Sequence, residues 1–273
     1  MLRISRNGYY IIFASQIYHT ACRISYRTAI YHFILPFHRL YAIMHLKVGD
    51  DMNEISFQNV RCLIRKPKDF NPEKRYPVLL FLHGAGTRGN DISKLYTNPF
   101  FQLTDVYQNF PFVTIAPLCE QNTWFDIWER LKLLVKDITA LPFADRYRIY
   151  VMGSSMGGYA TWQLAMSMPD CFAAIVPICG GGMYWNAGRL INVPVWAFHG
   201  AKDTTVLLEE SVKMVEAVKR HGGEAKLTVY PENSHDAWSD TYSNPDVFSW
   251  LLQHQSKSNN EYFDKYDNSD IYG

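Results

Sequence analysis

Predominantly apolar runs of strand length recur along most of this chain. Such runs are typical of strands buried on both faces of a parallel sheet. They predict strands over residues 78–82, 112–116, 147–152, 172–178, 193–198 and 225–230. The stretch 55–64 alternates between apolar and polar residues, which predicts a hairpin-like edge.

Apolar positions at helical spacing fall between these runs. They predict helices over residues 125–141, 159–168, 207–221 and 245–254. Strands that alternate with helices predict an α/β fold, with a mostly parallel central sheet and helices on both faces. In such sheets ligands bind at the carboxyl ends of the strands. Few residues separate the strands 172–178 and 193–198, so we expect no sizeable lid and an open site.

The segment from residue 149 to 160 has the pattern of a nucleophile elbow. A buried strand is followed by Gly-x-Ser-x-Gly, with Gly153 and Gly157 on either side of Ser155, and then by an Ala- and Met-rich helix. The tight turn leaves no room for bulky side chains two residues before and after the serine. Ser154 does not fit, because a pattern centred on it requires glycine at Met152 and Met156.

A serine nucleophile needs a base within hydrogen-bond reach. Four histidines follow Ser155 in the chain. His221 and His254 fall at predicted helix ends, where a capping role is usual. His199 ends a predicted strand, where a buried, hydrogen-bonded role is expected. His235 lies in a polar loop after the last strand and is therefore the predicted base.

The base in turn needs an acid that orients it. Asp203 follows a predicted strand and is the candidate. Asp170 falls at the opposite end of the sheet, and Asp236 is too close in sequence to His235. Ser155, Asp203 and His235 then occur in the order expected of an α/β-hydrolase. For the developing oxyanion, the predicted donors are the backbone N–H groups of Met156, Ala85 and Gly86.

Composition narrows the class of protein. The 273 residues are 48% hydrophobic and carry a formal net charge of +1, which gives no electrostatic case for nucleic acid or an acidic membrane surface. Five cysteines, without metal-binding spacing, favour reduced thiols and a cytoplasmic location. Secretion and a Cys171–Cys179 disulfide stay open. No apolar run reaches about 18 residues, so no membrane span is predicted.

Residues 1–43 differ from the rest. They contain five arginines and no aspartate or glutamate. A targeting segment, an amphipathic anchor, and a start-site artefact with the working protein beginning at Met44 or Met52 all stay open. We expect 1–43 to be an atypical N-terminal extension, 44–255 the catalytic domain and 256–273 a polar, disordered tail.

From about residue 57 to 252 the chain resembles α/β-hydrolase esterases, the group that includes feruloyl esterases, polyhydroxybutyrate-depolymerase-like esterases and prolyl-oligopeptidase-type hydrolases. The chain departs from this pattern at residues 1–43 and at Asn233-Ser234, where a glycine is more usual. The resemblance is carried by Leu82-His83-Gly84-Ala85-Gly86, Ala116-Pro117-Leu118-Cys119, Gly153-Ser154-Ser155-Met156-Gly157-Gly158-Tyr159, Pro177-Ile178-Cys179-Gly180-Gly181, Phe198-His199-Gly200-Ala201-Lys202-Asp203 and His235-Asp236-Ala237-Trp238.

The resemblance implies a serine esterase with the α/β-hydrolase fold that forms an acyl-enzyme on Ser155. It also suggests that Trp124 lines the acyl or alcohol pocket, and a core or surface position is equally compatible. Tyr184 and Trp185 are expected to form part of the wall of the open site. The expected substrate is a small-molecule or polysaccharide-linked ester, with feruloyl or acetyl esters of plant polysaccharide as the family-level analogy. No metal, organic cofactor or nucleic acid is expected.

Two other functions stay open beside the esterase. A prolyl-oligopeptidase-type peptidase is disfavoured because these 273 residues hold no propeller-sized domain. A non-catalytic binding protein on the same fold is disfavoured by the intact set of Ser155, Asp203 and His235. Hydrolysis of the dienelactone type would place a cysteine at the nucleophile, and Ser155 argues against it. The oligomeric state is not predicted.

Overall fold

The computed structural model describes residues 52–107 and 109–256, and within them eight strands form one sheet. The predicted extension over 1–43 and residues 257–273 of the predicted tail lie outside this part. The strands are β1 (Met52–Phe57), β2 (Val60–Arg65), β3 (Tyr76–Leu82), β4 (Val113–Pro117), β5 (Ala144–Ser154), β6 (Ala174–Ile178), β7 (Val195–Gly200) and β8 (Ala225–Tyr230).

The sheet is mostly parallel, as predicted. Its strand order is β1-β2-β4-β3-β5-β6-β7-β8. β1 pairs with β2 and β2 with β4 in antiparallel fashion, whereas the pairs from β4 through β8 are parallel. The strands β3 to β8 therefore all run in the same direction, and their carboxyl ends lie at one edge of the sheet. The candidate residues follow these ends in the sequence.

The antiparallel hairpin of β1 and β2 confirms the edge predicted over residues 55–64. Phe57 pairs with Val60, so the turn between the strands has two residues, Gln58 and Asn59. Both have positive φ, 52° and 59°. A two-residue hairpin loop of this kind requires this conformation, because its twist matches that of the flanking strands.

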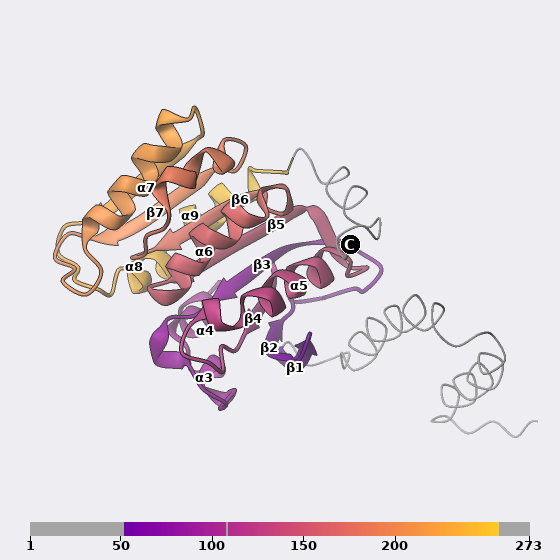
Figure 1. Ribbon diagram of the computed structural model, residues 1–273. Coiled ribbons are helices and arrows are strands. Elements are labelled where there is room, and N and C mark those ends of the chain that lie inside the picture. The colour runs from indigo at the N-terminus through magenta and orange to yellow at the C-terminus, as the bar shows by residue number, and fades with distance from the viewer. Residues whose placement is uncertain (1–51, 108, 257–273) are drawn as a thin grey trace, which may run out of the picture. The chain divides into compact units, whose positions relative to one another are not determined.

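Helical segments cover both faces of the sheet. In Figure 1, α5, α6 and α7 run across the near face, and α9 lies behind the sheet. On that other face, apolar residues of α4, α8 and α9 pack into one core with side chains of β3, β5 and β6. The segments are η1 (Ala85–Thr87), α3 (Ser93–Tyr96), α4 (Pro99–Thr104), η2 (Trp124–Ile127), α5 (Trp128–Thr139), α6 (Met156–Ser167), η3 (Pro169–Cys171), η4 (Tyr184–Leu190), α7 (Leu208–Arg220), α8 (Trp238–Ser243) and α9 (Pro245–Leu252).

Two helices differ from the prediction. The helix expected over residues 125–141 is divided into η2 and α5. The Asp126 carboxylate accepts a hydrogen bond from the Thr123 N–H at 2.8 Å, which fixes the first turn in a tighter form. The short helix α8 is not among the predicted helices, because its six mostly polar residues carry no period. Tertiary packing forms it instead: the Tyr242 ring meets those of Phe81, at 5.8 Å, and Phe100, at 5.3 Å.

Glycines allow α6 to start directly against the sheet. A Cβ atom at Gly157 would lie 1.9 Å from the carbonyl oxygen of Leu82 in β3, and one at Gly158 would lie 2.4 Å from that of Ile178 in β6. Neither backbone oxygen is free to move, because both belong to the sheet. The first turn of α6 is therefore held between two strands by contacts that no larger residue permits.

This close approach predicts that Gly157→Ala destabilises the protein by about 3 kcal/mol, since overpacking against fixed backbone has no cheap relaxation. Urea unfolding followed by circular dichroism measures the change. Gly86→Ala is the matched control: a Cβ there meets nothing within 4 Å. Its stability should stay within about 0.5 kcal/mol of wild type. Equal stability of both variants would show that the contact is not rigid.

Candidate active site

The serine of the predicted elbow lies between β5 and α6. Ser155 has φ 55° and ψ −118°, a conformation that costs a residue with a side chain about 1–3 kcal/mol. Its N–H donates to the carbonyl oxygen of Ile178 at 2.9 Å. Gly153 and Gly157 cross closely, since a Cβ at Gly153 would lie 2.4 Å from the Gly157 oxygen. The two glycines are therefore required by the turn itself, as the sequence predicted.

His235 reaches Ser155 from the loop that follows β8. Its Nε2 lies 2.8 Å from the Ser155 Oγ, and its Nδ1 lies 2.7 Å from Oδ2 of Asp203. An ionised carboxylate only accepts hydrogen bonds, so Nδ1 carries the proton and Nε2 is the acceptor for the serine hydroxyl. The imidazole is 21% exposed and stands edge-on to the Trp238 ring at 5.3 Å.

Asp203 is buried beneath His235, in the loop after β7. Its Oδ1 accepts hydrogen bonds from the N–H groups of Thr205 and Val206, both at 2.9 Å. Burial by itself raises the pKa of this carboxyl, but the hydrogen bonds from His235, Val206 and Thr205 outweigh it and hold the pKa below its ordinary value. Asp203 is therefore a fixed anion at neutral pH.

The loops that carry Asp203 and His235 are fastened to each other. A Cβ at Gly200 would lie 2.1 Å from the Ser234 oxygen, so the second loop passes directly over the end of β7. The Lys202 N–H donates to the Asn233 oxygen at 2.9 Å. His199 lies underneath, with Nε2 2.9 Å from the Val206 oxygen and Nδ1 2.7 Å from the Ser211 Oγ. His199 thus has the buried, hydrogen-bonded position expected from the sequence.

The predicted oxyanion donors lie at the start of two helical segments. Met156 is the first residue of α6, and Ala85 and Gly86 are the first two of η1. Amides in these positions have no acceptor within their own helix. The loop before η1 lies against the serine, because a Cβ at Gly84 would meet the Ser154 oxygen at 3.3 Å and the Ser155 Cβ at 3.5 Å. The loop that leads to Ala85 and Gly86 thus passes beside Ser155, and the role of these amides and of Met156 as oxyanion donors stays a prediction.

A buried histidine holds this loop in place. Nδ1 of His83 lies 2.7 Å from the Gly84 oxygen, and Nε2 accepts the Cys119 N–H at 3.0 Å. Burial is the main reason that the pKa of His83 falls to about 4, and the cations Arg88 and Lys94 lower it further. The ring is therefore neutral near pH 7, as one donated and one accepted bond require.

Trp124 packs on His83 instead of lining a pocket. Its side chain is fully buried, its Nε1–H donates to the His83 oxygen at 3.0 Å, and the two rings lie 4.8 Å apart. The pocket-lining position expected from the resemblance is thus not observed. The structure shows the core position that the sequence left open.

Comparisons with known proteins identify the family of the chain. The model of the dienelactone hydrolase family matches residues 114–261, which is more than half of the chain. The chain belongs to the dienelactone hydrolase family. A crystal structure of a thermostable esterase is 30% identical, with a TM-score of 0.64, and the match covers 76% of this chain and 64% of that one.

More distant relatives of this dienelactone hydrolase family member include a peptidase. Dipeptidyl-peptidase 5 of Porphyromonas gingivalis is 20% identical over 241 residues, covering 70% of this chain and 33% of the relative. The chain spans a third or less of the first curated relatives that it matches. Est1E from Butyrivibrio proteoclasticus, 17% identical with a TM-score of 0.56, covers 75% of this chain and 98% of that one and shares the fold.

Membership of the dienelactone hydrolase family confirms the predicted resemblance to α/β-hydrolase esterases. This family and the esterase groups named from the sequence share the α/β-hydrolase fold, and an esterase is among the structural neighbours of the chain. The residue at the elbow of this chain is nevertheless serine, not the cysteine expected for dienelactone-type hydrolysis.

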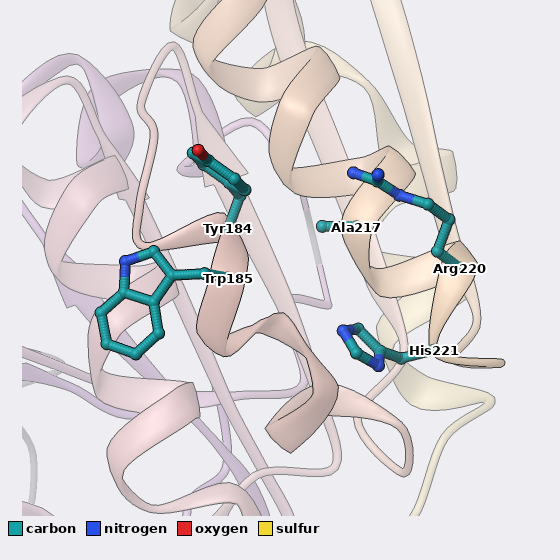
Figure 2. Close-up of a pocket in the computed structure, with 5 residues that line it drawn as sticks. All are labelled: Tyr184, Trp185, Ala217, Arg220 and His221. Carbon is teal, nitrogen blue, oxygen red and sulfur yellow. The ribbon is translucent and has the colours of Figure 1, made fainter.

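The two aromatic residues predicted for the wall of the site lie in η4. Trp185 is 69% exposed and Tyr184 50% exposed. Together with three residues of α7 and its end, they line a pocket of about 330 Å³ (Figure 2). Ser155, Asp203 and His235 do not line this pocket, so a role of Tyr184 and Trp185 at the site stays a prediction. The α7 residues are Ala217, Arg220 and His221.

The four cysteines within the described residues are free and buried, so Cys171 and Cys179 do not pair. Cys179 is a residue of the site that sequence reasoning missed. Its sulfur lies close to Asp203 and His235. The only signal was its place directly after a strand that ends at the catalytic edge. No helix within residues 52–107 and 109–256 is both long and apolar enough to cross a membrane.

The lowered pKa of His83 predicts a pH-dependent stability. The ordinary value is 6.5 and the folded value about 4, so between them the unfolded chain binds more protons. The contribution of neutral His83 is therefore complete above pH 6.5 and is lost as the pH falls toward 4, by about 3 kcal/mol. The stability difference between wild type and His83→Gln should shrink by this amount between about pH 7 and 4. Urea unfolding at each pH measures it, and a constant difference would contradict the buried, neutral ring.

Proposed function

We propose that the protein is a serine hydrolase that cleaves carboxylic esters through an acyl-enzyme on Ser155. One observation supports this above all, the continuous set of hydrogen-bond distances from Ser155 Oγ to His235 Nε2, 2.8 Å, and from His235 Nδ1 to Asp203 Oδ2, 2.7 Å. A nucleophile, a base and an acid that orients the base are the groups that acyl transfer to a serine needs.

In the proposed mechanism, the Ser155 Oγ attacks the ester carbonyl carbon while its proton passes to Nε2 of His235. The carbonyl oxygen becomes an oxyanion, which accepts hydrogen bonds from the N–H of Met156 and from Ala85 or Gly86. The tetrahedral intermediate then expels the alcohol, which takes the proton from Nε2. Water, deprotonated by the same nitrogen, attacks the acyl-enzyme and releases the carboxylic acid and free Ser155.

Asp203 acts through His235 in this mechanism and touches no substrate. Its lowered pKa keeps the carboxylate ionised, and the bond to Nδ1 holds the imidazole in the tautomer whose Nε2 has a free lone pair. When Nε2 takes the serine proton, the buried carboxylate lies next to an imidazolium and stabilises it. Rigid support is provided by the Thr205 and Val206 amides, which hold Oδ1.

The proposed substrates are feruloyl or acetyl esters of plant polysaccharide. Exposed aromatic side chains follow the strands whose carboxyl ends form the site. Phe125, 48% exposed, lies in η2 after β4, and Tyr184 and Trp185 lie in η4 after β6. Rings in such places are suited to stack on an aryl group or a sugar. The esterase found among the solved structures supports the ester, whereas the dipeptidyl-peptidase keeps an amide substrate as the competing class.

Ser155→Ala should lower kcat for p-nitrophenyl acetate by about 10⁴-fold or more, because the nucleophile is lost. Ser154→Ala is the matched control, one residue away on β5, and should keep its activity. Turnover of p-nitrophenyl butyrate, methyl ferulate and a proline-containing peptide amide is measured beside it. Cleavage of the peptide without cleavage of any ester would show that the protein is a peptidase and not an esterase. Activity retained by Ser155→Ala would refute the proposed nucleophile.

The exposed rings of Phe125, Tyr184 and Trp185 predict a selective effect of substitution on aryl esters. Trp185→Ala should raise KM for methyl ferulate about three- to tenfold and leave p-nitrophenyl acetate unchanged, since a lost aromatic contact costs about 0.5–1.5 kcal/mol. Ile191→Ala is the control, because Ile191 is also about half exposed, 51%, but lies at the other end of η4. Equal KM values for methyl ferulate in wild type, Trp185→Ala and Ile191→Ala would show that Trp185 does not belong to the binding site.

A further inference from the structure

A buried thiol lies beneath the candidate catalytic residues, and the mechanism does not use it. Cys179 follows β6 directly, has a positive φ of 38° and is 0% exposed. Its N–H donates to the Phe198 oxygen in β7 at 2.8 Å. Burial raises the pKa of its thiol above the ordinary range, and backbone hydrogen bonds from Ser155 and Ala237 oppose this in part. The side chain is thus a protonated thiol at neutral pH.

This thiol forms a cluster with two groups of the site. The Cys179 Sγ, a carboxylate oxygen of Asp203 and a ring nitrogen of His235 all lie within 4.8 Å of one another. Thiolate, imidazole and carboxylate are together the ligand set of zinc, whereas Mg²⁺ and Ca²⁺ require oxygen ligands alone. A thiolate and a carboxylate also carry two negative charges, which would neutralise a divalent ion in a buried place.

We propose that Cys179, Asp203 and His235 form an inhibitory site for Zn²⁺, in which the ion is bound by Sγ, a carboxylate oxygen and Nδ1. The inhibitory part of this inference rests on the proposed function, because it assumes that His235 acts as the base. The site is not one for a resident cofactor of the reaction: the ion competes with the hydrogen bond that the reaction needs.

The mechanism of inhibition follows from the two nitrogens of His235. Nδ1 carries a proton that it donates to Asp203 at 2.7 Å, and a metal-bound Nδ1 cannot keep it. In the zinc complex the neutral ring carries its proton on Nε2, which then points a donor at Ser155 and cannot accept the serine proton. The thiol loses one proton to solvent as the Zn–S bond forms. One ion is thus bound and one proton is released, with the imidazole in the inactive tautomer.

The required movements are small. Zinc bonds of about 2.0–2.3 Å in tetrahedral geometry hold ligand atoms roughly 3.3–3.8 Å apart. Nδ1 and Oδ2 therefore separate by about half an ångström from their present 2.7 Å, and pairs as far apart as 4.8 Å move closer. Asp203 and Cys179 are buried, whereas His235 is 21% exposed, so the ion enters beside the imidazole. We therefore expect inhibition to increase with time of preincubation.

Hydrolysis of p-nitrophenyl acetate after preincubation with ZnCl₂ tests the site. Wild type should lose its turnover, with MgCl₂ having no effect. In Cys179→Ala and Cys179→Ser the concentration for half-inhibition should rise at least about tenfold, since even an outer partner of a metal ligand is worth about 10–100-fold in affinity. Cys171→Ala is the matched control, because Cys171 is equally buried but outside the cluster, and should respond like wild type. Equal inhibition of the Cys179 variants and wild type would overturn the proposal.

A second measurement does not depend on turnover. Co²⁺ is added to Ser155→Ala, which keeps all three ligands, and the near-ultraviolet absorption of a cobalt–thiolate bond is recorded. The band should form in Ser155→Ala and be absent from the double variant that carries both Ser155→Ala and Cys179→Ala. Its absence from Ser155→Ala would refute the metal site even if the esterase were active. The band in a protein without any ester turnover would uphold the site and refute the proposed function.

Discussion

The contact between the first turn of α6 and the backbone of the sheet is the constraint on which the rest of the site depends. Gly157 lies against the Leu82 oxygen so closely that a Cβ would be 1.9 Å away, and Ser155 is held by the Ile178 oxygen on the other side. These contacts sustain a positive φ at a residue with a side chain, which costs about 1–3 kcal/mol. These backbone contacts therefore hold Ser155, which is half-buried, at the edge of the sheet.

The other groups of the site are likewise supported by contacts of the main chain. Asp203 and His235 lie in loops that are joined at Lys202 N–H and Asn233 oxygen, and Gly200 lets one loop cross the other. The oxyanion loop is fixed by His83, whose two nitrogens are both engaged. Asp203 and His83 are thus held by main-chain partners, and Asp203 in turn orients His235, which is the arrangement that preorganised catalysis requires.

The sequence was sufficient for those features that have a local pattern. Apolar runs predicted the parallel strands, and because parallel strands end at one edge, the positions of Ser155, Asp203 and His235 after their strands predicted that they meet. Trp124 has no such pattern. Its burial depends on a hydrogen bond from its indole to the His83 oxygen, 41 residues earlier in the chain. The short helix α8 and the position of Cys179 likewise arise from tertiary contacts, which periodicity does not report.

Substrate choice must come from outside the set of Ser155, His235 and Asp203. Esterases and dipeptidyl-peptidases both occur among the similar proteins, and acyl transfer asks the same of a serine, a base and an acid in either case. The proposed oxyanion donors are backbone amides, which respond to any carbonyl oxygen. We propose that discrimination comes from side chains of η2 and η4, where exposed aromatic rings follow the ends of β4 and β6. On this proposal, a change of substrate follows from new side chains in η2 and η4 and needs no change at the elbow.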